Sequence, residues 1–274
     1  MRTCSNDDRQ QIKADSSQNY FLQGNHSNSR GKLAIVGIGP GDANHLTPKA
    51  REAILASTVI VGYSTYLDLI PELINTKILV KTGMTQEIDR CRQAIQYALA
   101  GERVSVISGG DAGIYGMAGL ILELLHQTGK AQQVDVEIIP GISALNAAAA
   151  LVGAPLMQDF AAISLSDLLI PWDIIQKRIE LAAQAYFVIV FYNPKSKRRK
   201  VQIVVAQEII AKYRHGNTPV AVVTNATRAN QKVSISNLSD FTDLPIDMFT
   251  TVIIGNSSSK SYGNHIITSR GYPV

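Results

Sequence analysis

The sequence predicts an α/β protein with two domains, and three observations support this fold class. From Lys32 onward, apolar runs alternate with helical patterns, which is typical of a largely parallel sheet covered by helices on both faces. The chain has 274 residues, 46% of them hydrophobic and 18% charged, which is enough for two modest domains. The pattern breaks at residues 153–159, Gly-Ala-Pro-Leu-Met-Gln-Asp, where we place the domain junction.

Residues 1–30 precede the first apolar run and are rich in Ser, Asn, Gln and Asp. Their few apolar side chains, such as Ile12 and Phe21, bury too little area to offset the entropy lost on ordering. We therefore expect a disordered extension.

The first domain is expected over residues 31–153. Its strands are predicted at 33–37, 59–61, 104–108 and 136–139, and its helices from 47 and over 85–100, 115–126 and 143–152. Thr47 and Pro48 supply an N-cap and a proline at the first helical position. Thr85 is expected to cap the second helix, which Gly101 ends.

The second domain is expected over residues 159–257, followed by a tail at 258–274. Its strands are predicted at 160–164, 186–192, 220–224 and 249–254, with an extra strand at 232–235 and a helix over 171–185. The order of these elements predicts a smaller, mixed α/β domain.

Composition excludes several classes of function. Cys4 and Cys91 are too few for a disulfide framework, a thiolate zinc site or an iron–sulfur cluster, and no histidine has ligand spacing, so we expect no metal. No apolar run reaches the 18–20 residues or so that span a bilayer, and no signal peptide is evident. We expect a cytoplasmic protein without a membrane or nucleic-acid partner. The net charge of +4 favours an anionic ligand.

The first glycine-rich loop, VGIGPGD at residues 36–42, follows a predicted strand. Its spacing is G-x-G-P-G instead of the dinucleotide-binding G-x-G-x-x-G. The strand at 59–61 ends in Gly62 and Tyr63, where a ribose-binding acid would be expected. The loop therefore argues against a nicotinamide cofactor, and taken alone it fits a tight turn without a ligand.

Two more loops leave predicted strands at the same edge of the sheet, SGGDAGIYG at residues 108–116 and PGISA at 140–144. In open α/β sheets, ligands bind at the carboxyl ends of the strands. Glycine is used where the chain turns with positive φ or where a ligand lies against the main chain. These loops therefore predict a binding site.

Taken in order, six segments resemble the tetrapyrrole methylase family, the S-adenosylmethionine-dependent enzymes of cobalamin and sirohaem synthesis. They are VGIGPGD, SGGDAGIYGMA, PGISAL, FYNPKSKRR, VTNATR and TTVIIGNSSS, and the resemblance covers residues 31–257. Within this family, the second and fourth segments are similar to those of enzymes that methylate C17 of precorrin-3B or cobalt-precorrin-3 with ring contraction. The resemblance implies two α/β domains with a trough between them, unlike a Rossmann methyltransferase, and a homodimer.

The resemblance also implies which residues contact S-adenosylmethionine. They are Pro40, Gly109, Gly110, Asp111, Ile114, Ser143, Ala144, Asn193 and Ala226. Asn193 and Ala226 depart from the family, which often has Met and Gly there. The bare backbone at Gly109, Gly110 and Gly113 is expected to let a folded cofactor lie on the main chain.

The tetrapyrrole would bring a rim of acetate and propionate carboxylates, for which Lys195, Lys197 and Arg198 are the expected partners. Arg199 and Lys200 fit a solvated helix face better. Ring contraction needs a proton donor or acceptor, and Asp42, Asp111 and Tyr115 are candidates. Asp42 also fits a purely structural role in an Asx-turn. Two alternatives stay open: a uroporphyrinogen-III or precorrin-4 methyltransferase of the same family, and a ligand-sensing α/β module without turnover.

Overall fold

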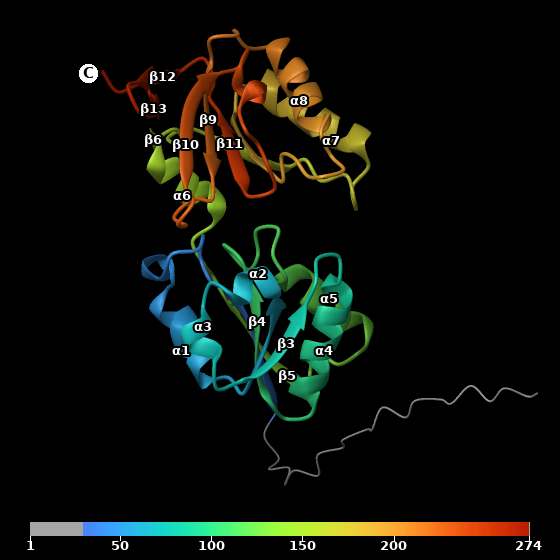
Figure 1. Cartoon of the computed structure of the whole chain (residues 1–274). Coiled ribbons are helices and arrows are strands. Elements are labelled where there is room, and N and C mark those ends of the chain that lie inside the picture. Colours follow the sequence, from blue (N-terminus) through green and yellow to red (C-terminus); the bar gives the residue numbers. More distant parts are fainter. Residues whose placement is uncertain (1–29, 274) are drawn as a thin grey trace, which may run out of the picture.

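The computed structural model describes residues 30–273, which form two lobes joined by a short connection (Figure 1). Residues 1–29, on which the expected extension falls, lie outside the described residues. Both lobes are built on a five-stranded sheet with helices packed on it. The predicted two-part α/β architecture is confirmed.

The first lobe has a fully parallel sheet in the order β3-β2-β4-β1-β5. Its strands are β1 (Gly31–Gly37), β2 (Val59–Tyr63), β3 (Ile78–Thr82), β4 (Arg103–Ser108) and β5 (Val134–Ile139). Its helices are η1 (Ala43–His45), α1 (Pro48–Ala56), α2 (Ser64–Leu67), α3 (Pro71–Ile74), α4 (Glu87–Leu99) and α5 (Ala118–Gln127). Two apolar clusters, one on each face of the sheet, form its core.

Helix boundaries in this lobe follow local chemistry. The Thr47 hydroxyl accepts a hydrogen bond from the Ala50 N–H at 3.1 Å and Pro48 begins α1, as predicted. Thr85 does not cap α4, because it has a left-handed φ of 66° and the helix begins after Gln86. Helix α5 begins at Ala118 and not at residue 115, because the glycine-rich loop extends further than expected.

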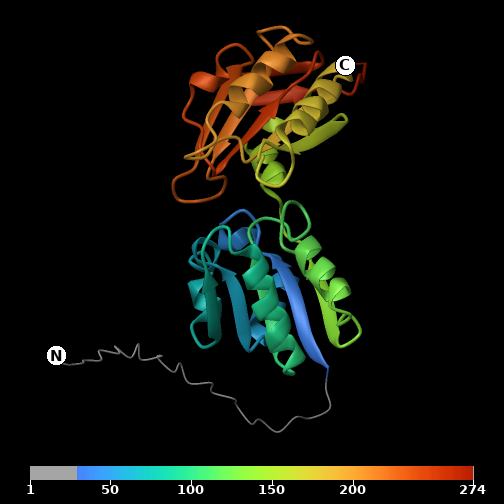
Figure 2. The same cartoon turned by 90° about the vertical axis from the view of Figure 1, so that its right-hand side faces the viewer.

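The second lobe has a mixed sheet in the order β10-β9-β11-β8-β7, in which β7 and β8 are parallel and the other neighbours antiparallel. Its strands are β7 (Phe160–Ser164), β8 (Val188–Tyr192), β9 (Pro219–Thr224), β10 (Lys232–Asn237) and β11 (Thr250–Ile254). Helices α7 (Trp172–Gln184) and α8 (Gln202–Ala211), with η2 (Phe241–Asp243), pack on one face. Figure 2 shows α7 and α8 side by side on this sheet.

Helix α6 (Ala144–Leu151) covers the other face of the second sheet. Leu145 and Ala148 of this helix are buried against Val190, Val223 and Ile253 of the second sheet. The chain therefore passes between the lobes at residues 140–143, ahead of α6 (Figure 1). The junction expected at 153–159 was placed too late, because an alanine-rich helix carries no sign of which sheet it covers.

The segment expected to be a tail, residues 258–274, contains two strands. β12 (Ser259–Tyr262) and β13 (His265–Thr268) form a hairpin, and β13 pairs in parallel with β6 (Gly153–Ala154). Ile266 is buried with α6 in the core of the second lobe. The hairpin therefore belongs to the second lobe, and the expectation of a tail is wrong for residues 259–268.

Candidate functional site

The carboxyl ends of the parallel strands in the two lobes face one another. In the first lobe, loops 38–42, 109–117 and 140–143 follow β1, β4 and β5. In the second lobe, residues 165–166, 193–200 and 225–228 follow β7, β8 and β9. Hydrogen bonds join the two groups, including one of 2.8 Å from the Arg228 Nε–H to the Pro40 carbonyl oxygen. We call these six segments the interlobe site.

The three loops of the first lobe pack backbone against backbone. The N–H groups of Gly39 and Gly110 each donate to the other's carbonyl oxygen, at 3.0 and 2.8 Å. A Cβ on Gly37 would lie 2.7 Å from the Gly110 oxygen, and a Cβ on Gly141 would lie 2.2 Å from the same atom. These two glycines are needed for the loops to meet.

The glycines expected to face a cofactor have different surroundings. A Cβ on Gly109 would lie 2.6 Å from the Tyr66 ring, so this glycine makes room for a side chain of the protein. Gly110 has a φ of +68°, and the nearest atom to its added Cβ would be the Ala144 nitrogen at 3.6 Å. A Cβ on Gly113 would have only the Asp111 Oδ1 atom within 4 Å, at 3.3 Å. Open backbone is therefore present at Gly110 and Gly113.

The Asp111 carboxylate is held by backbone N–H groups from two loops. Its Oδ1 accepts hydrogen bonds from Gly113 at 2.8 Å and Ile114 at 3.0 Å, and its Oδ2 accepts one from Gly141 at 3.0 Å. Three backbone donors thus hold both carboxylate oxygens in place. Asp111 therefore fixes the shape of the second loop and its contact with the third.

Tyr115 crosses from the second loop to the second lobe. Its hydroxyl donates to the Ala162 carbonyl oxygen of β7 at 3.0 Å, and its ring lies 5.0 Å from that of Tyr192. The Tyr192 oxygen in turn accepts a hydrogen bond from the Leu145 N–H at 3.0 Å. Burial raises the pKa of both phenols, so both stay protonated at neutral pH.

A cavity of about 610 Å³ adjoins these tyrosines. Gly113, Ile114 and Tyr115 line it from the second loop, and Leu145, Asn146, Leu156, Phe160 and Ala162 line it from the second lobe. Ser143 and Ala144, expected at the cofactor, immediately precede this part of α6, and the Ser143 hydroxyl caps the helix. The cavity is within the usual size range for small-molecule sites and is mainly apolar with few polar groups.

The first loop carries Pro40 and Asp42, both sequence-predicted. The Asp42 carboxylate accepts a hydrogen bond from the Asn44 N–H at 2.7 Å and so caps η1, which is the Asx role weighed from the sequence. Its N–H donates to the Thr227 hydroxyl of the second lobe at 3.4 Å. Pro40 is buried, and its carbonyl oxygen accepts the hydrogen bond from the Arg228 guanidinium.

The loop after β8 is held by Arg199. The Arg199 guanidinium donates to the Asn193 carbonyl oxygen at 2.9 and 3.2 Å and lies 4.0 Å from the Asp167 carboxylate. Arg199 is buried, so the expected solvated position is wrong, and the segment before α8 is a loop and not a helix. Asn193, expected at the cofactor, has a φ of 49° and donates to the Ser164 hydroxyl at 3.0 Å.

The structure places the remaining predicted residues on this same edge of the second lobe. Lys195 is half-buried, and Lys197 and Arg198 are exposed in the loop after β8. Ala226 is buried after β9, against α6 and the second sheet. Among residues 30–273, no carboxylate lies within ion-pair distance of Lys195, Lys197 or Arg198.

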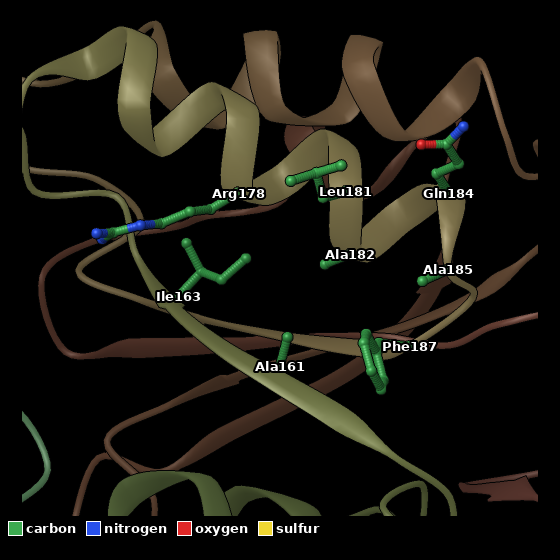
Figure 3. A pocket seen from close by; sticks show the side chains of 8 residues that line it. All are labelled: Ala161, Ile163, Arg178, Leu181, Ala182, Gln184, Ala185 and Phe187. Atoms are coloured by element: carbon green, nitrogen blue, oxygen red, sulfur yellow. The ribbon is translucent and has the colours of Figure 1, made fainter.

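A second cavity, of about 650 Å³, lies away from the interlobe site. Figure 3 shows it between α7 and the edge strand β7, lined by Ala161, Ile163, Arg178, Leu181, Ala182, Gln184, Ala185 and Phe187. It contains no residue that the sequence predicted for a site.

Several residues in or beside the interlobe site were not predicted from the sequence, namely Arg228 within it and Tyr66, Tyr192, Leu145, Asn146 and Ala162 next to it. Tyr192 and Arg228 lie within the quoted segments FYNPKSKRR and VTNATR, so their positions were available but not their contacts. Ala162 takes part through its carbonyl group, for which a sequence carries no signal.

In the described part of the chain, no three His, Cys, Asp or Glu side chains gather in a way that could hold a metal ion. The helices within residues 30–273 are also too short or too polar to cross a membrane.

Comparison with known proteins identifies relatives of this arrangement. Residues 32–242 match the family model of tetrapyrrole (corrin/porphyrin) methylases. The chain is 52% identical over 245 residues to the cobalt-factor III methyltransferase of Priestia megaterium, covering 89% of this chain and 45% of that longer protein. It is 47% identical to the probable cobalt-factor III C(17)-methyltransferase of Salmonella typhimurium, covering 88% of this chain and 100% of the relative. The crystal structure of the methyltransferase CobJ superposes with a TM-score of 0.82 at 35% identity, covering 87% of this chain and 100% of that one.

Proposed function

Because the chain belongs to the tetrapyrrole methylase family, we propose that it transfers a methyl group from S-adenosylmethionine to C17 of cobalt-factor III or precorrin-3B, with contraction of the macrocycle, in cobalamin biosynthesis. The observation that carries this proposal is the 47% identity over the whole length of the Salmonella typhimurium relative. The relative from Priestia megaterium, named for the same substrate, supports it over the 45% of its length that this chain spans.

The residues at the interlobe site fit S-adenosylmethionine. Gly110 and Gly113 leave open backbone, and the neighbouring cavity is lined by apolar side chains and by the Asn146 amide. We assign cofactor contacts to Gly110, Ile114 and Ala144, with Asp111 holding the second loop in place. The cofactor supplies an activated methyl group on a sulfonium, so the protein mainly has to align donor and acceptor.

Of the three candidates for proton transfer in ring contraction, Tyr115 is the best placed. Asp111 is occupied by three N–H donors, and Asp42 caps η1. The Tyr115 phenol is protonated at neutral pH, and it can donate its proton to the substrate once it gives up the hydrogen bond to the Ala162 carbonyl oxygen. We propose Tyr115 as the donor, and we assign structural roles to the two carboxylates.

The carboxylates of the tetrapyrrole need cationic partners. Lys195 and Lys197 follow the Asn193–Pro194 turn at the edge of the second lobe that faces the first. Because no carboxylate in residues 30–273 pairs with either ammonium group, both are free for an anionic substrate. We propose that they bind its acetate or propionate groups, with Arg198 contributing from the exposed side of the loop.

We also propose that the protein works in the cytoplasm as a homodimer, without a nucleic-acid or membrane partner. Dimers are what the resemblance implies, and the substrate is a small, anionic biosynthetic intermediate. Light scattering at micromolar concentration tests the dimer, and a mass equal to one chain of 29.7 kDa would contradict it.

The function is tested by anaerobic incubation with S-adenosylmethionine labelled in its methyl group. Cobalt-factor III, precorrin-3B and uroporphyrinogen III are offered in separate reactions. We expect label in one of the first two macrocycles and none in uroporphyrinogen III. Label in uroporphyrinogen III would favour the alternative methyltransferase, and binding of S-adenosylhomocysteine without any transfer would favour a sensing module.

A further inference from the structure

The Arg228 side chain lies where the two lobes meet. It follows β9 in the second lobe, yet its Nε–H donates to the Pro40 carbonyl oxygen of the first lobe at 2.8 Å. Its guanidinium lies 5.7 Å from the centre of the Phe249 ring. The chain leading to it is unusual, since Asn225 and Thr227 have left-handed φ values of 52° and 63°. Left-handed conformations are uncommon for residues other than glycine and persist where the surrounding structure holds them.

The first glycine-rich loop is shaped to receive this side chain. Gly41 has a φ of +150°, and a Cβ added to it would lie 2.5 Å from Arg228 Cγ and 2.8 Å from Nε. The neighbouring Asp42 N–H donates to the Thr227 hydroxyl at 3.4 Å. Gly41, the third glycine of the G-x-G-P-G loop, therefore makes room for the Arg228 side chain of the other lobe. This contact explains why the glycine spacing differs from that of a dinucleotide-binding site.

The Arg228 charge has no anionic partner in the described chain. No carboxylate within residues 30–273 lies within ion-pair distance of it. Burial lowers its pKa, which Tyr66 partly offsets. The Pro40 bond uses Nε, and neither Nη1 nor Nη2 has a hydrogen-bond partner in residues 30–273. Those two nitrogens form one of the edges with which arginine binds a carboxylate.

The surroundings suit a large, flat anion. Tyr66 follows β2, and its ring packs on Gly109 of the second loop. Phe249 immediately precedes β11, and its ring lies beside the Arg228 guanidinium. The Arg228 guanidinium thus lies over one aromatic ring, that of Phe249, at the carboxyl ends of β1 and β9.

We propose that Arg228 is a carboxylate-binding site that anchors one acetate or propionate group of the tetrapyrrole. The inference rests on the proposed function, because that function supplies a polycarboxylate substrate. Arg228 and the lysines at 195 and 197 would then hold the rim of the macrocycle from two different strands, β9 and β8.

The test measures the affinity for uroporphyrin III, a stable tetrapyrrole polycarboxylate, by fluorescence quenching at two ionic strengths. Arg228→Met is expected to weaken binding roughly ten- to a hundredfold and to reduce its salt dependence. Arg228→Lys should recover only part of the affinity, because an ammonium cannot bind a carboxylate through two parallel hydrogen bonds. Gly41→Ala, which displaces the guanidinium, should resemble Arg228→Met. The matched control is Lys232→Met, an exposed cation at the start of β10, which should bind like the wild type.

S-adenosylhomocysteine affinity and melting temperature separate anchoring from a purely structural role. Anchoring predicts that Arg228→Met keeps cofactor affinity within about threefold while losing tetrapyrrole affinity. Equal loss of both affinities, or no loss of tetrapyrrole affinity, would overturn the proposal. A wild-type protein that binds S-adenosylhomocysteine but no tetrapyrrole would instead overturn the proposed function, and the anchoring role with it.

Discussion

The Tyr115 hydroxyl donates a 3.0 Å hydrogen bond to the Ala162 carbonyl oxygen and thereby ties the second glycine-rich loop to the edge strand of the other lobe. Tyr115 has a left-handed φ of 53°, a conformation that is rare for aromatic residues and costs energy. On the opposite side, Arg228 ties the first loop to the end of β9. In the second sheet, β11 and β8 lie between these two connections. The interlobe site is therefore bordered by both contacts.

Replacing Tyr115 with Phe separates its two roles. Loss of the hydrogen bond to Ala162 should cost about 0.5–1.5 kcal/mol, so S-adenosylhomocysteine affinity should fall by about tenfold or less. If the phenol supplies the proton for contraction, that step should slow by roughly 10²–10⁴. Incorporation of labelled methyl and the absorption spectrum of the macrocycle follow the two steps separately. Contraction at the wild-type rate would remove Tyr115 from the chemistry.

Gly110→Val should abolish cofactor binding while leaving a folded protein. The φ of +68° at Gly110 disfavours any branched side chain, and the added atoms would fill the space beside Ala144. Gly113→Val should act in the same direction through the cavity that Gly113 lines. Gly119→Val in α5 is the matched control, because no atom lies within 4 Å of its added Cβ. Calorimetry with S-adenosylhomocysteine measures binding, and circular dichroism confirms folding. Full affinity in folded Gly110→Val would show that this glycine serves only the turn.

Lys195→Met and Lys197→Met should raise the KM for the tetrapyrrole and leave cofactor affinity unchanged. Charge-assisted hydrogen bonds contribute roughly 1.5–3 kcal/mol when shielded and less when solvated. The half-buried Lys195 should therefore show the larger effect, up to about a hundredfold, and the exposed Lys197 the smaller. Lys212→Met, an exposed cation directly after α8 and outside the interlobe site, serves as the control. Wild-type kinetics in the double mutant at two ionic strengths would shift substrate binding to other residues.

Stability should decline on the alkaline side of neutrality. Burial raises the pKa of the Cys91 thiol to about 12, above the value near 8.5 of an unfolded chain. The stabilisation from the neutral thiol is complete below about pH 8.5 and is lost as pH rises towards 12. Burial shifts the pKa of Tyr66, Tyr115 and Tyr192 in the same direction. The melting temperature should therefore fall between about pH 9 and 11. Cys91→Ala should make this decline shallower, and an identical slope would show that Cys91 does not contribute to it.

Much of the fold was predictable because regular elements leave periodic signals. The strands at 33–37, 104–108 and 220–224 are buried apolar runs, and each was placed to within a few residues. Helix α6 was predicted, but the lobe it belongs to was not, because the choice of sheet depends on packing with β8, β9 and β11. The hairpin of β12 and β13 was missed because its residues, SKSYGNHIIT, are mostly polar.

The site was predictable as a set of loops but not as a set of contacts. Glycines at 109, 110 and 113 drew attention to the second loop, yet only the structure separates Gly109, which accommodates Tyr66, from the two that leave open backbone. Arg199 looked like one more cation in a basic run, but it is buried and holds the Asn193 carbonyl oxygen. Such roles depend on how the side chains are folded together, Tyr66 against Gly109 and Arg199 against Asn193 and Asp167, which no local pattern encodes.

The most direct test of the proposed function is to locate the transferred carbon. The protein is incubated anaerobically with S-adenosylmethionine carrying a ¹³C-methyl group and with cobalt-factor III, and the product is examined by NMR. The proposal predicts a single enriched methyl group bonded to C17 of the macrocycle. Enrichment at any other ring carbon, or an unlabelled macrocycle recovered with a cofactor-saturated protein, would contradict it.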